Sequence, residues 1–138
     1  MQVIVDKLHS HVPVTVLRIH GDLDGSNYQD LIAKAREVCA AGARHLLLDM
    51  SNMPYMSSAG LVALHSVAVL ARGEEPSSPE HGWAAFHAVS RDSSGKQTRV
   101  KLLNPQPRVD RTLQTTGMRE FFEVFTDLPT ALDSFKAE

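Results

Sequence analysis

The hydrophobic pattern of the chain alternates between the period of strands and the period of helices. Apolar and polar residues alternate over residues 3–8 and 14–20, on either side of a short connection at residues 11–13. This pattern is typical of an antiparallel pair of strands with one wetter face, and we expect the pair to form an edge of the sheet. Shorter apolar segments predict further strands at residues 45–49, 100–103 and 122–125.

Between these strands, apolar residues recur at helical spacing. The first such stripe consists of Tyr28, Leu31, Ile32, Ala35, Val38 and Cys39. Asp24, Ser26 or Asn27 is available as its N-cap, and Gly42 as its left-handed stop. A second helix, residues 58–71, is apolar around most of its circumference, so we expect part of it to be exposed or to face a partner.

Two more helices complete the pattern. Residues 104–107 start a helix that ends at Gly117, and Asp127 caps a terminal helix whose Leu132 and Phe135 point inward. Strands joined through helices predict right-handed crossovers and a largely parallel sheet. The expected fold is therefore α/β, with four to five mostly parallel strands, an antiparallel N-terminal edge strand and about four helices.

Residues 73–98 break this rhythm, and we interpret them as an insertion within a single domain of residues 1–138. Residues 73–82 are polar and Pro-rich, which predicts a loop. Residues 83–89 are apolar and would fit a strand that returns through residues 92–95 as a hairpin. Short apolar runs are ambiguous, so both the hairpin and its absence stay open.

Composition and charge narrow the class of protein. Lys and Arg are scattered and the net charge is -2, which disfavours nucleic-acid binding. No segment approaches the length of a membrane span and the N-terminus is not a signal peptide, so we expect a cytoplasmic protein without membrane insertion, a monomer or weak homodimer. Cys39 is the single cysteine, which excludes an intrachain disulfide and favours a buried, inert thiol.

Candidate catalytic groups do not combine into a site. His9 and His11 lack a third metal ligand at a recognised spacing, and Asp22 and Asp24 are explained by capping before a helix. Ser58 lacks the surroundings of a serine nucleophile. We therefore expect neither metal, cofactor nor enzymatic activity.

The most informative segment spans residues 46–64, where a strand ending in Asp49 is followed by Ser57-Ser58-Ala59-Gly60 at the start of the second helix. A helix start has unpaired N–H groups and favours negative charge. Ser58 is therefore expected to be both a helix cap and a well-placed phosphate acceptor.

This segment resembles the signature of STAS domains, the module of bacterial anti-sigma factor antagonists and of the cytoplasmic parts of sulfate transporters. The resemblance rests on Leu-Asp-Met-Ser at residues 48–51 and on Tyr-Met-Ser-Ser-Ala-Gly-Leu at residues 55–61. It extends to Gly-Asp-Leu-Asp at residues 21–24, Leu-Asn-Pro at residues 103–105 and Thr-Gly at residues 116–117. Ser58 falls on the phosphorylated position, while Ser57 replaces the acid that normally precedes it.

The resemblance implies a STAS fold and a switch in transcription regulation. The unphosphorylated protein would bind an anti-sigma factor of the histidine-kinase-like ATPase type, which would phosphorylate Ser58, or less readily Ser57, and end the association. The implied contact surface, with the first turn of the second helix exposed, consists of Asp22, Asp24, Asn52, Met56, Ser57, Ser58 and Leu61. The alternative is a small-molecule-binding or scaffolding STAS module of a sensor or transporter-associated complex.

Overall fold

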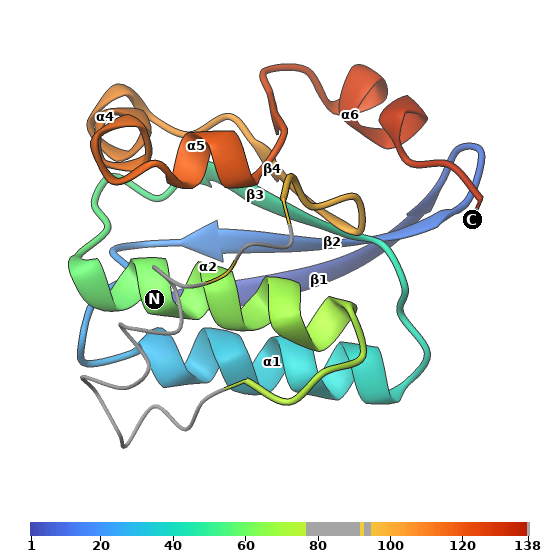
Figure 1. Ribbon diagram of the computed structural model, residues 1–138, viewed down its shortest axis with the longest axis horizontal. Coiled ribbons are helices and arrows are strands. Elements are labelled where there is room, and N and C mark those ends of the chain that lie inside the picture. The colour runs from blue at the N-terminus through green and yellow to red at the C-terminus, as the bar shows by residue number, and fades with distance from the viewer. Residues whose placement is uncertain (77–91, 93–94, 138) are drawn as a thin grey trace.

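The structure is a computed structural model that describes residues 1–76, 92 and 95–137. The described residues form a five-stranded sheet in the order β1-β2-β3-β4-β5 (Figure 1). β1 and β2 are antiparallel and every other neighbouring pair is parallel, which confirms the predicted α/β fold and its antiparallel edge. The strands are β1 (Gln2–His9), β2 (Pro13–His20), β3 (Leu46–Asn52), β4 (Val100–Leu103) and β5 (Val124–Phe125).

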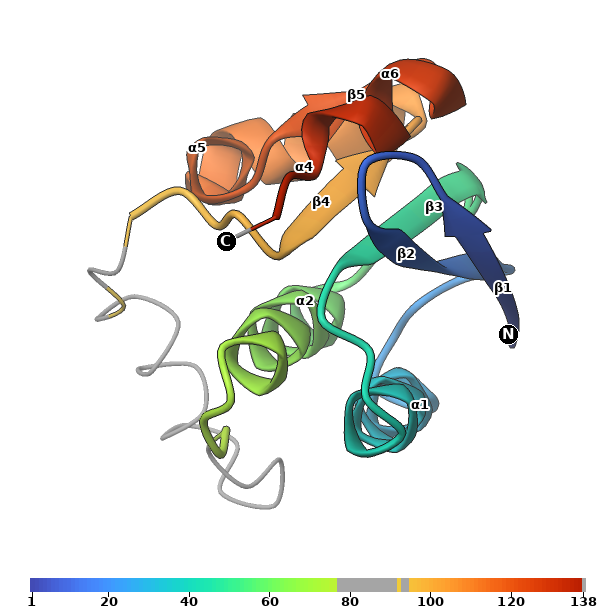
Figure 2. The same ribbon diagram turned by 90° about the vertical axis from the view of Figure 1, so that its right-hand side faces the viewer.

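Helices pack on both faces of the sheet (Figure 2). The larger core lies on the face covered by α1 (Tyr28–Ala40) and α2 (Ser58–Ala71), and it also receives side chains of α4 (Pro107–Thr116) and α5 (Met118–Phe121). On the opposite face, α6 (Leu128–Ser134) covers a smaller core through Ala131, which lies beside Phe135 just after the helix. The sheet is thus the middle layer of the domain.

Local sequence signals mark the ends of two helices and the start of a third where they were expected. Gly42 follows α1 with a φ of 108°, and Gly117 follows α4 with a φ of 80°, both in the left-handed region that favours glycine. Asp127 caps α6, since its carboxylate accepts a hydrogen bond from the Thr130 N–H at 2.8 Å. These three predictions are confirmed.

The prediction that part of the apolar circumference of α2 is exposed is wrong. Ser58, the first residue of the helix, is exposed, but the helix is buried from Gly60 to Ala71. The burial comes from packing against other elements. α1 packs along one side of α2, and the centroid of the Phe121 ring of α5 lies 5.7 Å from the centroid of the His65 ring. The apolar residues of α2 from Gly60 onward are thus buried, as expected for a helix that is apolar on all sides.

The end of the chain also differs in detail from the prediction. Residues 122–125 were expected to form a strand, but only Val124–Phe125 pair with β4. The chain instead adds the short helix α5 after Gly117, and Phe122 closes that helix with its side chain fully buried. A short apolar run fits either structure, and here core packing decides.

The predicted hairpin at residues 83–89 lies outside the described residues. One described residue of the insertion, Asp92, reaches the far end of α2. Its carboxylate lies 2.6 Å from His65 Nε2 and accepts a hydrogen bond from Arg72 at 3.0 Å. The insertion is thereby joined to α2 two turns or more from Ser58.

Candidate functional site

The candidate site forms where β2 and β3 end and α2 begins. Two segments run side by side there, the turn at residues 21–24 and the loop at residues 52–57. Three backbone hydrogen bonds join them: Gly21 N–H to Asn52 O (2.9 Å), Leu23 N–H to Tyr55 O (3.0 Å) and Ser57 N–H to Leu23 O (2.9 Å). The predicted site residues Asp22, Asp24, Asn52 and Ser57, which are distant in sequence, are thereby brought to one surface.

Ser58 is exposed and is the first residue of α2. The expectation that Ser58 itself caps the helix is therefore wrong by one position, because Ser57 is the N-cap residue, with extended backbone (φ -85°, ψ 178°). Within the described structure, no side-chain hydrogen bond from Ser57 caps the helix. The Ser58 hydroxyl thus stands at a helix start that favours negative charge.

Side-chain hydrogen bonds fix the conformation of the acidic turn, residues 21–24. The Asp24 carboxylate accepts hydrogen bonds from the N–H (2.9 Å) and the hydroxyl (2.6 Å) of Ser26, and these bonds lower the pKa of Asp24. Asn27 is the N-cap residue of α1, but its side chain binds back to the backbone of Asp22 and Asp24. The Asp22 residue is exposed.

Met56 and Leu61 lie beneath this surface, with exposed fractions of 4% and 5%. The expectation that Leu61 is exposed is therefore wrong. The cause is the close approach of α2 to the turn: a Cβ on Gly60 would lie 2.3 Å from Met56 Cγ and 3.2 Å from a methyl group of Leu23. Glycine at this position lets the helix start pack directly on Leu23 and Met56.

The structure adds Arg108 to this surface, which sequence reasoning did not include. Its guanidinium carbon lies 5.5 Å from the centroid of the Tyr55 ring, whose residue is 40% exposed. The Gln106 side chain donates a hydrogen bond to Ser51 O at 2.7 Å, which fixes the start of α4 beside the end of β3. No local sequence signal links α4 to the loop at residues 52–57, because the two are far apart in sequence and only the fold brings them together.

Other chemistry is sparse in the described part of the chain. It contains no group of three or more His, Cys, Asp or Glu residues placed to hold a metal ion. Nor does any described helix have the length and apolar character needed to cross a membrane.

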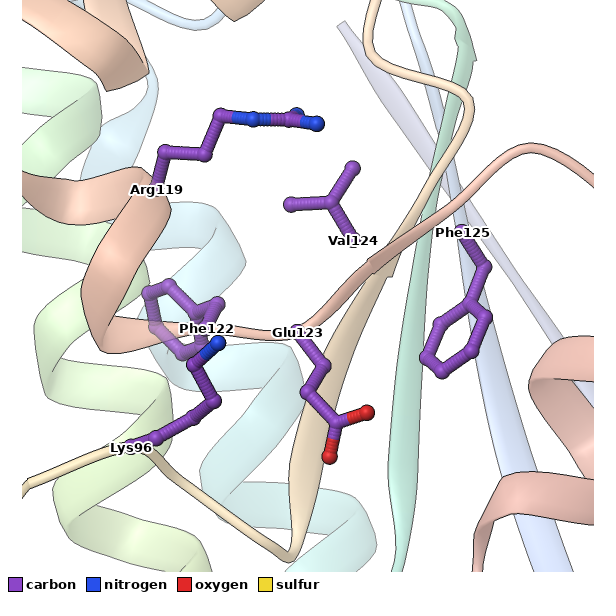
Figure 3. Close-up of a pocket in the computed structure, with 6 residues that line it drawn as sticks. All are labelled: Lys96, Arg119, Phe122, Glu123, Val124 and Phe125. Atoms are coloured by element: carbon purple, nitrogen blue, oxygen red, sulfur yellow. The ribbon is translucent and has the colours of Figure 1, made fainter.

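A cavity of about 270 Å³ lies beside β5 and is lined by Lys96, Arg119, Phe122, Glu123, Val124 and Phe125 (Figure 3). Arg119 pairs with Asp110, and Glu123 lies 3.4 Å from the Lys101 ammonium group. Much of the charge that lines this cavity is thus balanced by ion pairs within the protein.

The fold and the site geometry agree with a family match. Residues 5–73, half of the chain, match the STAS domain family. The chain therefore belongs to the STAS domain family. No significant match was found among curated protein sequences.

Solved structures with the same fold include three anti-sigma factor antagonists. The antagonist from Mycobacterium paratuberculosis has a TM-score of 0.64 and 21% identity, over 95% of this chain and 90% of that chain. A putative antagonist from Thermotoga maritima has a TM-score of 0.64 and 14% identity, over 94% and 92%. The Bacillus cell fate determinant SpoIIAA, in its phosphorylated form, has a TM-score of 0.55 and 18% identity, over 94% and 96%. At such identities the likeness concerns the fold.

Proposed function

We propose that this protein is an anti-sigma factor antagonist whose binding to its anti-sigma factor ends when Ser58 is phosphorylated. The observation that carries the proposal is the exposed Ser58 hydroxyl at the start of α2, beside a surface shared with Asp22 and Asn52. Its support from comparison is the STAS family membership and the antagonist structures with the same fold.

The proposed partner is an anti-sigma factor of the histidine-kinase-like ATPase type that also acts as the kinase. In the transfer, Ser58 Oγ attacks the γ-phosphorus of ATP, the hydroxyl proton is released, and ADP leaves. Ser57 is half-buried, whereas Ser58 is exposed, which favours Ser58 as the acceptor. The proposal makes the protein a substrate and a switch in the cytoplasm rather than an enzyme.

The charge of the product explains the switch. A phosphate adds about 1.5 to 2 negative charges, which the first turn of a helix tolerates because its N–H groups and dipole favour anions. The same charge placed within a protein interface must lose its water, which is costly for an ionised group. Phosphorylation should therefore leave the fold intact and weaken docking.

The test uses three variants, Ser58→Asp, Ser58→Ala and, as a matched control, Ser57→Ala. Ser58→Asp adds a carboxylate to the first turn, so its melting temperature should stay within roughly 3 °C of the parent. Its affinity for the anti-sigma factor should fall at least about tenfold, or about 1.4 kcal/mol. Ser58→Ala should bind but resist phosphorylation, and Ser57→Ala should bind and be phosphorylated.

The measurements are calorimetric binding to candidate anti-sigma kinases and phosphopeptide mapping after incubation with ATP. Wild-type affinity in the Ser58→Asp variant would remove the basis of the switch. A phosphate found mainly on Ser57 would instead reassign the acceptor and leave the partner class in place.

A further inference from the structure

A groove of about 470 Å³ lies between α1 and the edge hairpin formed by β1 and β2. It sits at the end of the sheet opposite to Ser58: the groove is lined by Pro13 and Thr15 at the start of β2, whereas the site of Ser58 adjoins Leu23, after the end of β2. The groove is therefore separate from the surface proposed for the anti-sigma factor.

Two regular elements build the walls of this groove. Lys34 and Val38 of α1 and Ala41, its C-cap residue, follow one another at spacings of four and three residues, so they form one stripe along the helix and its end. On β1, Val5 and Lys7 are two residues apart and share one face of the strand. A helix and a strand thus supply much of the wall, and residues 41–43 after α1 complete it.

The floor of the groove is apolar. Val5, Val38 and Ala43 are partly buried side chains that pack against the larger core. Thr15, opposite Lys7 in the register of the two strands, is only 7% exposed. A ligand with an alkyl chain would therefore cover apolar surface that water now reaches, which is a favourable exchange.

The rim of the groove carries an excess positive charge. Lys34 is paired with Glu37, whose carboxylate lies 3.2 Å from its ammonium group. Lys7 is exposed and forms no ion pair with any carboxylate of the described residues. Lys7 is thus the cation available to an anionic ligand, with the Lys34–Glu37 pair beside it.

The other cavities differ in character. The cavity beside β5, about 270 Å³, contains Arg119 and Glu123, which are both in ion pairs, as described above. A cavity of about 540 Å³ beside α6 is lined by Lys101, whose ammonium group already binds the carbonyl and hydroxyl oxygens of Ser134 at 3.0 Å. The groove beside α1 joins an apolar floor to an exposed lysine, and its volume lies in the range usual for ligand sites.

We propose that this groove binds a straight-chain carboxylate, with the alkyl chain on Val5, Val38 and Ala43 and the carboxylate on Lys7. The assignment goes beyond the proposed switch and does not depend on it. Charge complementarity selects an anion, and an apolar floor that lies between a helix and a strand favours a linear chain. The negative charge of Glu37 repels an anionic ligand, so the groove should prefer a ligand with one carboxylate over a dianion.

The test is a titration of the protein of residues 1–138 with decanoate, followed by the amide NMR signals and by calorimetry. Saturable binding should shift the signals of Lys7, Thr15 and Val38, while decyltrimethylammonium, with the same chain and the opposite charge, should not bind there. Acetate, which lacks the chain, should also fail to bind. These comparisons use the wild-type protein and need no variant to fold.

Three variants then test the role of each charge. Lys7→Gln should weaken decanoate binding at least about tenfold, since it removes the charged partner of the carboxylate. Glu37→Gln should tighten it roughly twofold to fivefold, because Lys34 loses a competing carboxylate. Lys136→Gln, an exposed lysine on the other side of the sheet, is the matched control and should not change the affinity.

Unchanged affinity in Lys7→Gln, or equal binding of the cationic detergent, would overturn the assignment. So would the absence of saturable shifts at these residues. Ser58→Asp should bind decanoate like the parent, so failure of the groove and failure of the phosphorylation switch are distinguishable.

Discussion

Replacement of Gly60 by alanine tests the close packing that sets the start of α2. A Cβ at this position would lie 2.3 Å from Met56 Cγ and 3.2 Å from a methyl carbon of Leu23. Cβ atoms in proteins do not come within 2.3 Å of another side-chain atom, so Met56 or the backbone of α2 would have to move. Met56 is 4% exposed and Leu23 is fully buried, which leaves the methionine side chain little free space to move into.

Two opposing effects determine the magnitude. Alanine is the better helix former, by roughly 0.5–1 kcal/mol over glycine. Overpacking a filled core costs about 1–3 kcal/mol. We therefore expect Gly60→Ala to lower the free energy of unfolding by about 1–2 kcal/mol, and the melting temperature by roughly 3–8 °C.

The assay is urea unfolding followed by circular dichroism, with Gly25→Ala as the matched control. In the described structure nothing lies within 4 Å of a Cβ at Gly25, and its φ is not in the left-handed region, so this variant should be as stable as the parent or slightly more stable. The unfolding slope should be the same in all variants, because the exposed area hardly changes.

A double variant identifies the contact itself. Met56→Ala removes the atom that the new methyl group would meet, so Gly60→Ala combined with Met56→Ala should lose less than the sum of the single losses. If Gly60→Ala is as stable as the parent or more stable, the close approach costs no more than the gain in helix propensity, and the reasoning from the close approach is refuted.

Two further predictions concern polar groups on the smaller core side. The hydrogen bond from Thr130 N–H lowers the pKa of Asp127, so its charged form stabilises the folded state; this contribution is present at neutral pH and is lost as the pH falls through the lowered pKa. Asp127→Ala should thus melt below the parent at pH 7, and melting curves of the two should converge in acid; a constant gap would contradict the charge effect. Lys101 is 4% exposed and its ammonium group lies 4.8 Å from the Phe135 ring centroid. Lys101→Met should cost about 1 kcal/mol in urea unfolding and Lys101→Ala about 3 kcal/mol, whereas equal losses would show that the aliphatic stem contributes no packing.

The parts of the fold that sequence predicts well are those set by local chemistry. Alternation fixes the β1–β2 pair, and the conformational demands of Gly42 and Gly117 end two helices. The errors arise where distant elements decide. Leu61 is buried because its helix is enclosed by parts of the chain far away in sequence, and helical periodicity does not report such neighbours.

In the candidate site, too, the features set by local chemistry could be predicted and those set by distant elements could not. The helix start and the serines could be predicted because cap chemistry is local, but the N-cap residue is Ser57 rather than Ser58, and the Ser57 N–H bonds to Leu23 O across the surface. Arg108 could not be predicted, since its contact with Tyr55 depends on where α4 begins relative to β3. Pairings between elements are the information that a single sequence lacks.

The burial of α2 gives the proposed switch a physical basis. Ser58 lies at the exposed end of a helix whose residues from Gly60 onward belong to the buried interior. Charge added at Ser58 stays in water in the free protein and gains only about 0.3–1 kcal/mol from the helix dipole, so the core has no reason to rearrange. A partner seated on Asp22, Asn52 and Ser58 would have to remove that water, which costs several times more for an ionised group. The phosphate is thus more stable in water than in the interface. This difference in free energy, rather than a change of shape, would release the partner.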